Sequence, residues 1–227
     1  MPQTYILRVW MPDRPGALGA LASRIGAVGG DVTGIDILER GAGRAIDELV
    51  VELPDESLVE LLVAEIHQVD GVDIESIRLA VDALHDPRVD ALETAALLVG
   101  APTPSAAIEE LCVHAVRTVG ANWGVVLDQS DGSIVSAVGE CPPAAWIAAF
   151  VAGSQSSARV VDGDLGPSDM VWAPLSAAGR ALVMGRNGES FRARERRQAA
   201  ALARIVDTRF RELTVSARRG QHPSMKG

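Results

Sequence analysis

The stretch DRPGAL, from Asp13 to Leu18, has the residue types that hold a carboxylate through the protein backbone. A helix is predicted to open at Pro15–Gly16, and the first N–H groups of a helix have no partner within it. The helix N-terminus also carries partial positive charge, so these groups can hold an anion. Pro15 suits the first helical turn, and Gly16 lets a ligand approach the backbone. The alternative is structural, with Asp13 capping the helix and Arg14 pointing to solvent.

Patterns for catalysis or metal binding do not occur in the sequence. The histidines are scattered: His67, His85, His114 and His222. None lies at metal-ligand spacing from another histidine or a cysteine. Cys112 falls on an apolar helical stripe, Cys141 is isolated, and Asp162–Gly166 is more typical of a turn than of a calcium loop. Phosphate-binding, dinucleotide-binding and GxSxG motifs are missing too. We therefore expect no enzyme activity, no metal and no cofactor.

Composition and charge are those of a soluble globular protein. Of 227 residues, 48% are hydrophobic and 22% charged, and no apolar run is long enough to predict a membrane span. The N-terminus resembles a strand rather than a signal peptide, and two cysteines make no disulfide framework, so we expect a cytoplasmic protein. Arginine outnumbers lysine twenty to one, which hints at a bacterial source.

The net charge of −9 is unevenly distributed along the chain. Between Arg186 and Gly227 there are eleven basic residues and four acidic ones, so the remainder is strongly acidic. An acidic body disfavours nucleic acid as a partner, and only the arginine-rich C-terminus keeps that alternative open. A helix with a solvated arginine face and a disordered end is the simpler interpretation.

The first eighty residues have the pattern of a βαββαβ unit. Strands are predicted at 4–11, 31–40, 44–53 and 72–81, and a helix at 56–69. Another helix follows Pro15–Gly16 and ends at Gly29–Gly30, with an apolar stripe of Leu18, Leu21, Ala22, Ile25 and Val28. This order predicts one antiparallel sheet with both helices on one face. Ile6, Arg8 and Trp10 lie on the opposite side of the first strand from Leu7 and Val9, and that surface, with the open strand edges, predicts a homodimer.

This half resembles the ACT domain, a small-ligand regulatory module. The resemblance covers residues 4–81 and rests on DRPG-A-L after the first strand, the helix, and GGDV at the start of the second strand. In ligand-binding members the loop grips the carboxylate of an amino acid, together with the start of strand two from a neighbouring subunit. That implicates two sets of residues here: Met11, Asp13, Arg14, Gly16, Ala17 and Leu18 on one side, and Gly30, Asp31, Val32 and Thr33 on the other.

Asp31 departs from the family pattern, because ligand-binding relatives often have asparagine there. An asparagine side chain both donates and accepts hydrogen bonds, whereas an ionised aspartate only accepts. Asp31 could therefore pair with an α-ammonium group but would repel a nearby carboxylate. The ligand, and whether one binds, are left open by this difference.

The second half has helices and strands in a different order. Helices are predicted at 89–100, from Thr103–Pro104 to Val119, at 142–153, and from Ala193 to Leu213. Strands are predicted at 121–128, 133–140, 158–161, 169–176 and 180–186. Trp123, Trp146 and Trp172 either line a pocket or lie in the core, and we favour the core.

Residues 92–214 resemble a compact GAF domain. The resemblance rests on the segment VWAPLSAAGRALVMGRNGESF and the glutamate that opens the last helix, with Ala181 where a glycine often occurs. A sensor domain of the PAS type is the nearest alternative. The expected fold class is α+β, with a ferredoxin-like ACT domain at 1–82, a linker at 83–91, a GAF-like α/β sensor domain at 92–215, and a flexible basic tail at 216–227.

Together these features predict a non-enzymatic regulatory protein. It would bind a small ligand, most simply an amino acid, through the ACT domain and signal through dimerisation or a partner protein. One alternative is an interaction protein whose domains only dimerise. Another is nucleic-acid binding through the arginine-rich C-terminus.

Overall fold

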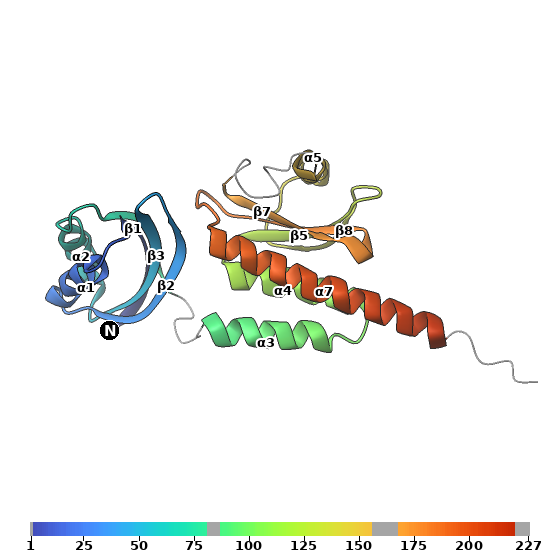
Figure 1. Cartoon of the computed structure of the whole chain (residues 1–227), viewed down its shortest axis with the longest axis horizontal. Coiled ribbons are helices and arrows are strands. Elements are labelled where there is room, and N and C mark those ends of the chain that lie inside the picture. The colour runs from blue at the N-terminus through green and yellow to red at the C-terminus, as the bar shows by residue number, and fades with distance from the viewer. Residues whose placement is uncertain (1, 81–86, 156–167, 221–227) are drawn as a thin grey trace, which may run out of the picture. The chain divides into compact units, whose positions relative to one another are not determined.

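The computed structural model describes residues 2–80, 87–155 and 168–220. Two compact units divide the chain, Met1–His85 and Asp86–Gly227. Both contain a four-stranded antiparallel sheet with helices packed on it (Figure 1). This confirms the predicted mixed α+β class.

The first unit has one sheet with strand order β2-β3-β1-β4. The strands are β1 (Gln3–Pro12), β2 (Asp31–Gly41), β3 (Arg44–Leu53) and β4 (Asp73–Leu79). Helices α1 (Ala17–Ala27) and α2 (Val59–Ile66) lie on the same face of this sheet, and the short 3-10 turn η1 (Glu56–Leu58) precedes α2 (Figure 1). The predicted split βαβ arrangement is therefore confirmed.

Alternation along the central strands builds the core of this unit. Leu7, Val9 and Leu49 are fully buried because they point from β1 and β3 toward the helices. Leu21 and Ile25 meet them from α1 at helical spacing. The opposite face of the sheet is different: Arg8 pairs with Glu48 at 2.9 Å. The surface predicted from Ile6, Arg8 and Trp10 is thus not a continuous apolar one.

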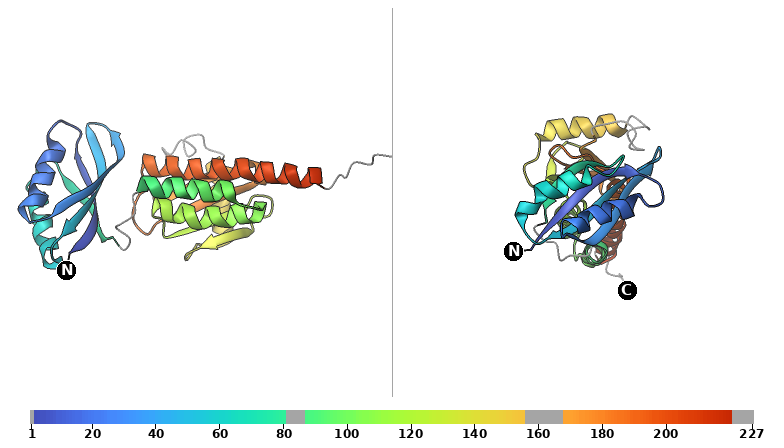
Figure 2. Two further views of the ribbon diagram at one scale, coloured as in Figure 1. Left: turned by 90° about the horizontal axis from the view of Figure 1, so that it is seen from below. Right: turned by 90° about the vertical axis from the view of Figure 1, so that its left-hand side faces the viewer.

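The second unit has a sheet with strand order β6-β5-β8-β7. Its strands are β5 (Trp123–Asp128), β6 (Ile134–Val138), β7 (Met170–Leu175) and β8 (Arg180–Gly185), with the 3-10 turn η2 (Ser176–Ala178) between β7 and β8. The helices are α3 (Pro87–Gly100), α4 (Pro104–Val119), α5 (Ala144–Gln155) and α7 (Ala193–Gly220). Helices α4 and α7 cover one face of the sheet and α5 the other, while α3 packs against both α4 and α7 (Figures 1 and 2).

A buried arginine connects four parts of the second unit. Arg186 directly follows β8 and is only 6% exposed. Its guanidinium donates to the carbonyls of Val119 and Gly120 at the end of α4, and it forms an ion pair with Glu195 in the first turn of α7. The same group lies 4.2 Å from the ring centre of Phe191. The segment GR…F…E on which the GAF resemblance rests therefore has a packing role.

Several predicted elements differ in extent from those observed. Helix α7 continues to Gly220, seven residues past the predicted end at Leu213, so the first residues of the predicted tail are helical. Helix α3 begins at Pro87, inside the predicted linker. Trp123 is buried, as expected of a core residue, but Trp146 is 47% exposed. The predicted strand at 158–161, the turn at 162–166 and residues 221–227 lie outside the described part of the chain. None of the described helices is long and apolar enough to span a membrane.

Candidate functional site

The DRPG loop turns the chain from β1 into α1. The N–H of Asp13 donates to the carbonyl of Gly43 at 2.9 Å, and its carboxylate lies 3.9 Å from the Nε of Arg40. Helix α1 begins at Ala17 rather than at Pro15, which lies in the preceding turn. Gly16 is the N-cap residue with φ 89°, a left-handed conformation that favours glycine. Gly16, rather than Asp13, is therefore the N-cap residue of α1.

The start of α1 leaves backbone donors available. The N–H of Ala17 bonds to the carbonyl of Arg14 at 3.3 Å, and that of Ala20 bonds to Gly16 at 3.0 Å. Between them, the N–H groups of Leu18 and Gly19 have no acceptor within the described residues. The first turn contains no acidic side chain that would neutralise the helix dipole. This end of the helix therefore keeps the positive potential that the sequence predicts.

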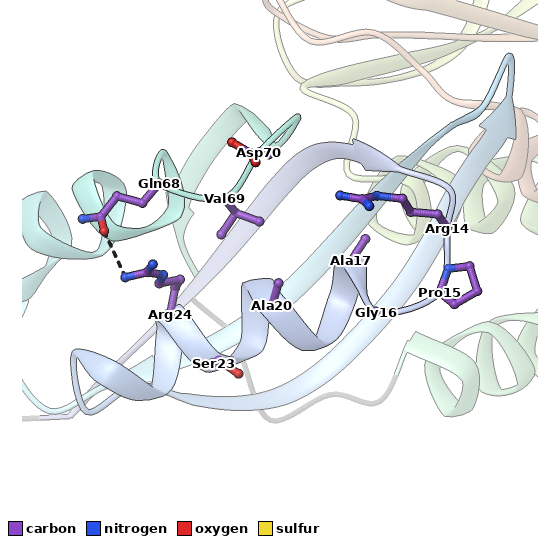
Figure 3. A pocket seen from close by; sticks show the side chains of 10 residues that line it. All are labelled: Arg14, Pro15, Gly16, Ala17, Ala20, Ser23, Arg24, Gln68, Val69 and Asp70. Atoms are coloured by element: carbon purple, nitrogen blue, oxygen red, sulfur yellow. Dashed lines mark hydrogen bonds between the residues drawn. The ribbon is translucent and has the colours of Figure 1, made fainter.

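A cavity of roughly 510 Å³ opens beside this helix start. Its lining comes from the loop and one side of α1, and from the turn after α2: Arg14, Pro15, Gly16, Ala17, Ala20, Ser23, Arg24, Gln68, Val69 and Asp70 (Figure 3). Small residues form the α1 side, which leaves the space open. Pockets for small molecules commonly range from about 300 to 1,000 Å³. The cavity is therefore large enough for a ligand of amino-acid size.

The charges around the cavity are of both signs. Arg14 is exposed, and in Figure 3 its guanidinium points over Ala17 toward Val69 and Asp70. Among the described residues no ion pair or hydrogen bond holds that guanidinium in place. Arg24 is different, because it bonds to Glu65 and Gln68, each at 2.9 Å. Arg14 is thus the cation that a ligand could reach, and Asp70 is an anion on the other side.

The two predicted sets of site residues do not meet within one chain. Of the first set, Arg14, Gly16 and Ala17 line the cavity, whereas Met11 is buried and Asp13 and Leu18 lie outside its lining. The second set, residues 30–33, follows the other end of α1. A helix of eleven residues is about 16 Å long. A site that uses both sets therefore requires a second copy of the chain.

The glycine pair at the end of α1 has a structural reason. Gly29 has φ 78° and ends the helix in the left-handed conformation, as predicted. A Cβ on Gly30 would lie 3.0 Å from side-chain atoms of both Ile25 and Leu53. The GGD segment therefore needs its glycines for packing, whether or not Asp31 contacts a ligand.

Sequence reasoning missed the part of the cavity that comes from the turn after α2. The sequence-predicted site does not include Gln68, Val69 and Asp70, which follow α2 some fifty residues after the loop. It also does not include Ser23 and Arg24 of α1. Nothing in the local sequence of that turn marks it as a binding segment. Only the packing of α1 beside α2 brings it along the cavity, which is a tertiary effect.

Cys112 is placed as a core residue rather than as a nucleophile. Burial raises the pKa of the Cys112 thiol, which also lies 3.4 Å from the carbonyl oxygen of Gly124. A thiol with a raised pKa is a poor nucleophile. Over residues 2–80, 87–155 and 168–220, no group of three or more His, Cys, Asp or Glu side chains could hold a metal ion.

Comparisons with known proteins support the assignment of the first unit. The family model of the ACT domain matches residues 5–71. A search of the curated proteins found no match. Among solved structures, the ACT domain of a GTP pyrophosphokinase from Chlorobium tepidum is 14% identical and covers 35% of this chain and 100% of its own, with a TM-score of 0.29.

Two further solved structures are similar to parts or most of the chain. An uncharacterised protein from Thermotoga maritima is 20% identical and covers 35% of this chain and 98% of its own, with a TM-score of 0.29. The chromophore-binding domain of a bacteriophytochrome from R. palustris is 10% identical and covers 94% of this chain and 95% of its own, with a TM-score of 0.38.

Proposed function

Residues 5–71 form an ACT domain, and from this premise we propose that the chain is a non-enzymatic regulatory protein that binds an amino acid beside the DRPG loop. The cavity next to the start of α1 is the observation that carries this proposal. It adjoins the loop implied by the family resemblance, and it is lined by Arg14, Gly16 and Ala17. Its size suits a small ligand.

The charges at the cavity favour a zwitterion. The guanidinium of Arg14 is a bidentate partner for a carboxylate, and the helix start adds positive potential. Asp70, on the far side, can accept hydrogen bonds from an α-ammonium group. An amino acid carries both a carboxylate and an ammonium group. A simple anion could pair with Arg14, but it would be repelled by the carboxylate of Asp70.

A homodimer through β2 would bring the two predicted sets of residues together. Strand β2 is an edge strand, and its Ile35 and Ile37 are 39% and 43% exposed. An exposed edge with apolar side chains favours pairing with another strand. Antiparallel pairing of two β2 strands about their centres places residues 31–33 of one copy near residues 39–41 of the other. Arg40 lies 3.9 Å from the carboxylate of Asp13, so this pairing would bring the second predicted set close to the DRPG loop of the other copy.

A thermal-shift screen of the twenty amino acids tests the proposal. A ligand at 100 times its Kd adds about 2.7 kcal/mol of stability, which is easily measured. Ala20→Met should abolish the shift, because it fills the cavity from an exposed helical position. Ala27→Met is the matched control, because Ala27 is exposed on the same helix and does not line the cavity. Gly16 is a poorer target, since any side chain there is strained at φ 89°.

Two outcomes would contradict this function. If no amino acid shifts the melting temperature while light scattering gives a dimer, the chain is an interaction protein without a ligand. If a ligand is found and Ala20→Met binds it like the wild type, the ligand site lies elsewhere. A monomer mass at micromolar concentration would contradict the homodimer.

A further inference from the structure

Arg24 presents a second set of hydrogen-bond donors at the far end of the cavity beside α1. Its Nη1 donates two hydrogen bonds, to Glu65 and Gln68 at 2.9 Å each. Its Nε and Nη2 have no acceptor among the described residues. These two nitrogens lie on one edge of the guanidinium and form the fork that binds a carboxylate through two parallel hydrogen bonds. Arg24 is therefore held in place through Nη1, while its fork stays available beside the cavity.

The groups around this fork favour a ligand atom that accepts hydrogen bonds. The carboxylate of Glu65 accepts from both Arg24 and Gln68, and Glu65 does not line the cavity. The hydroxyl of Ser23 donates to the carbonyl of Gly19 at 2.8 Å, so its hydrogen is already used. The hydrogens that remain for a ligand are on Arg24 and on the amide nitrogen of Gln68. A carboxylate, which only accepts, matches such a set of donors.

The two arginines of the cavity stand at opposite ends of α1. Arg14 precedes the helix, and Arg24 lies in its last turn. Ala17 and Arg24 are seven residues apart, which is roughly 10 Å along a helix. Figure 3 shows Ala20 and Val69 between the two arginine side chains. An apolar wall between two cationic ends suits a short chain of methylene groups with a carboxylate at each end.

We propose that the preferred ligand of this cavity is an acidic amino acid, and that glutamate fits better than aspartate. This inference rests on the amino-acid site proposed above. The α-carboxylate lies at Arg14 and the start of α1, the α-ammonium group at Asp70, and the side-chain carboxylate at the Nε–Nη2 fork of Arg24. The charged residues of the lining are two arginines and one aspartate, a net charge of +1 that the single negative charge of glutamate neutralises. Glutamate has one methylene more than aspartate and spans more of the distance between the arginines.

Other classes of amino acid use the cavity less completely. An apolar side chain leaves the fork of Arg24 without an acceptor, and lysine or arginine places a second cation against it. Glutamine is the sharpest comparison, because it has the length of glutamate. Its amide offers one acceptor oxygen in place of two and carries no charge. The difference in affinity between glutamate and glutamine therefore measures the contribution of the fork.

Calorimetric titration of the full chain tests this preference with four probes: L-glutamate, L-aspartate, L-glutamine and L-norvaline. L-glutamate should bind at least about tenfold more tightly than L-glutamine, because a charge-assisted hydrogen bond is about twice as strong as a neutral one. L-aspartate should bind more weakly than L-glutamate. L-norvaline, whose side chain ends in a methyl group, should bind more weakly than either acidic amino acid.

Arg24→Gln tests whether the fork causes the preference. The affinity for L-glutamate should fall at least about tenfold, to within about threefold of that for L-glutamine. Glu65→Gln is the matched control, because it removes the ion pair of Arg24 and leaves the fork in place. This variant should keep the preference for L-glutamate, and circular dichroism should show that both variants stay folded. Equal loss of the preference in both variants would mean that Arg24 acts only through its ion pair, and would overturn the proposed contact.

The remaining outcomes separate this inference from the proposed function. If L-glutamine or L-norvaline binds as tightly as L-glutamate, and Ala20→Met abolishes that binding, the amino-acid site stands and the acidic preference is overturned. A preference for L-glutamate that persists in Arg24→Gln would also overturn the inference, because another group would then hold the side-chain carboxylate. If none of the twenty amino acids shifts the melting temperature, the proposed function fails and this inference fails with it.

Discussion

Arg14 of the first unit and Arg186 of the second both stand just after a β-strand, but their surroundings are opposite. Arg186 is buried, ion-paired with Glu195, and hydrogen-bonded to carbonyls of three residues, including Ser190 at 3.3 Å. Arg14 is exposed beside a cavity. An arginine whose donors are all used within the chain holds the fold together, whereas one with free donors can bind a ligand. Arg186 therefore belongs to a structural motif, whereas Arg14 belongs to a candidate binding motif.

Removing Arg186 should have the largest effect on stability. Arg186→Ala leaves Glu195 buried without its cation and removes the donors to the end of α4. Breaking one partner of a buried ion pair costs about 3–5 kcal/mol. Urea unfolding in a Trp10→Phe background, followed by the fluorescence of the remaining tryptophans, reports the second unit alone, since all three lie in it.

Arg197→Ala is the matched control for that measurement. Arg197 is exposed on the same helix as Glu195, so its loss should change stability by no more than about 0.5 kcal/mol. If Arg186→Ala were no more destabilising than this control, the contacts of Arg186 would not stabilise the fold.

Removing Arg14 should lower ligand affinity and leave stability nearly unchanged. Arg14→Gln should leave the free energy of unfolding within about 0.5 kcal/mol of the wild type, because no partner within the described residues is lost. The affinity for the amino acid found in the screen should fall at least about tenfold, since a hydrogen bond to a charged group contributes roughly 1.5–3 kcal/mol. Calorimetric titration measures this change. Arg78→Gln is the control variant. Arg78 lies on β4 opposite Ile6, on the face of the sheet that the helices do not cover, so this variant should bind the ligand with normal affinity. Equal loss of affinity in both variants would mean that Arg14 acts only through net charge.

The difference between the two arginines could be predicted from the sequence only in part. DRPG after a strand, GGDV at the start of the next strand and the apolar periodicity between them predict the βαββαβ order, because glycine, proline and periodicity act locally. The GR…F…E segment was visible, but its contacts with Val119 and Gly120 join residues 66 or more positions apart. For the same reason Asp70 and Gln68 were not assigned to the cavity. Local chemistry predicts where a helix begins, but not which distant turn lies beside it.

Buried Asp47 offers a smaller test, in the first unit. Burial raises the pKa of its carboxyl, and nearby Arg40 opposes this only partly. One of its oxygens has no hydrogen-bond partner within the described residues. The pKa of the Asp47 carboxyl is higher in the folded state than its ordinary value of 3.8. The free energy of unfolding therefore falls as the pH rises from 3.8 through the folded pKa, because the unfolded chain loses this proton first. Asp47→Asn removes the buried charge and should raise stability at pH 7 by about 1 kcal/mol. A fall in melting temperature at pH 7 would show that Asp47 has an ionic partner.

The smallest expected effect concerns Asp128 in the second unit, whose pKa is lowered rather than raised, so its contribution to stability changes with pH in the opposite direction. Hydrogen bonds from the side chain and backbone of Ser130 lower the pKa of the Asp128 carboxyl, with the hydroxyl at 2.6 Å. A group with a lowered folded pKa contributes stability above its ordinary value of 3.8 and loses it as pH falls through the folded pKa. Ser130→Ala should therefore flatten the loss of stability of the second unit below about pH 4 and change little at pH 7. Ser133→Ala should act in the same way through Asp131, whose pKa the Ser133 side chain lowers. Acid titration, followed by Trp10 for the first unit and by the three remaining tryptophans for the second, would then give changes of stability with pH of opposite sign for Asp47 and Asp128. Slopes of the same sign would mean that one of these carboxylates has a different environment in solution.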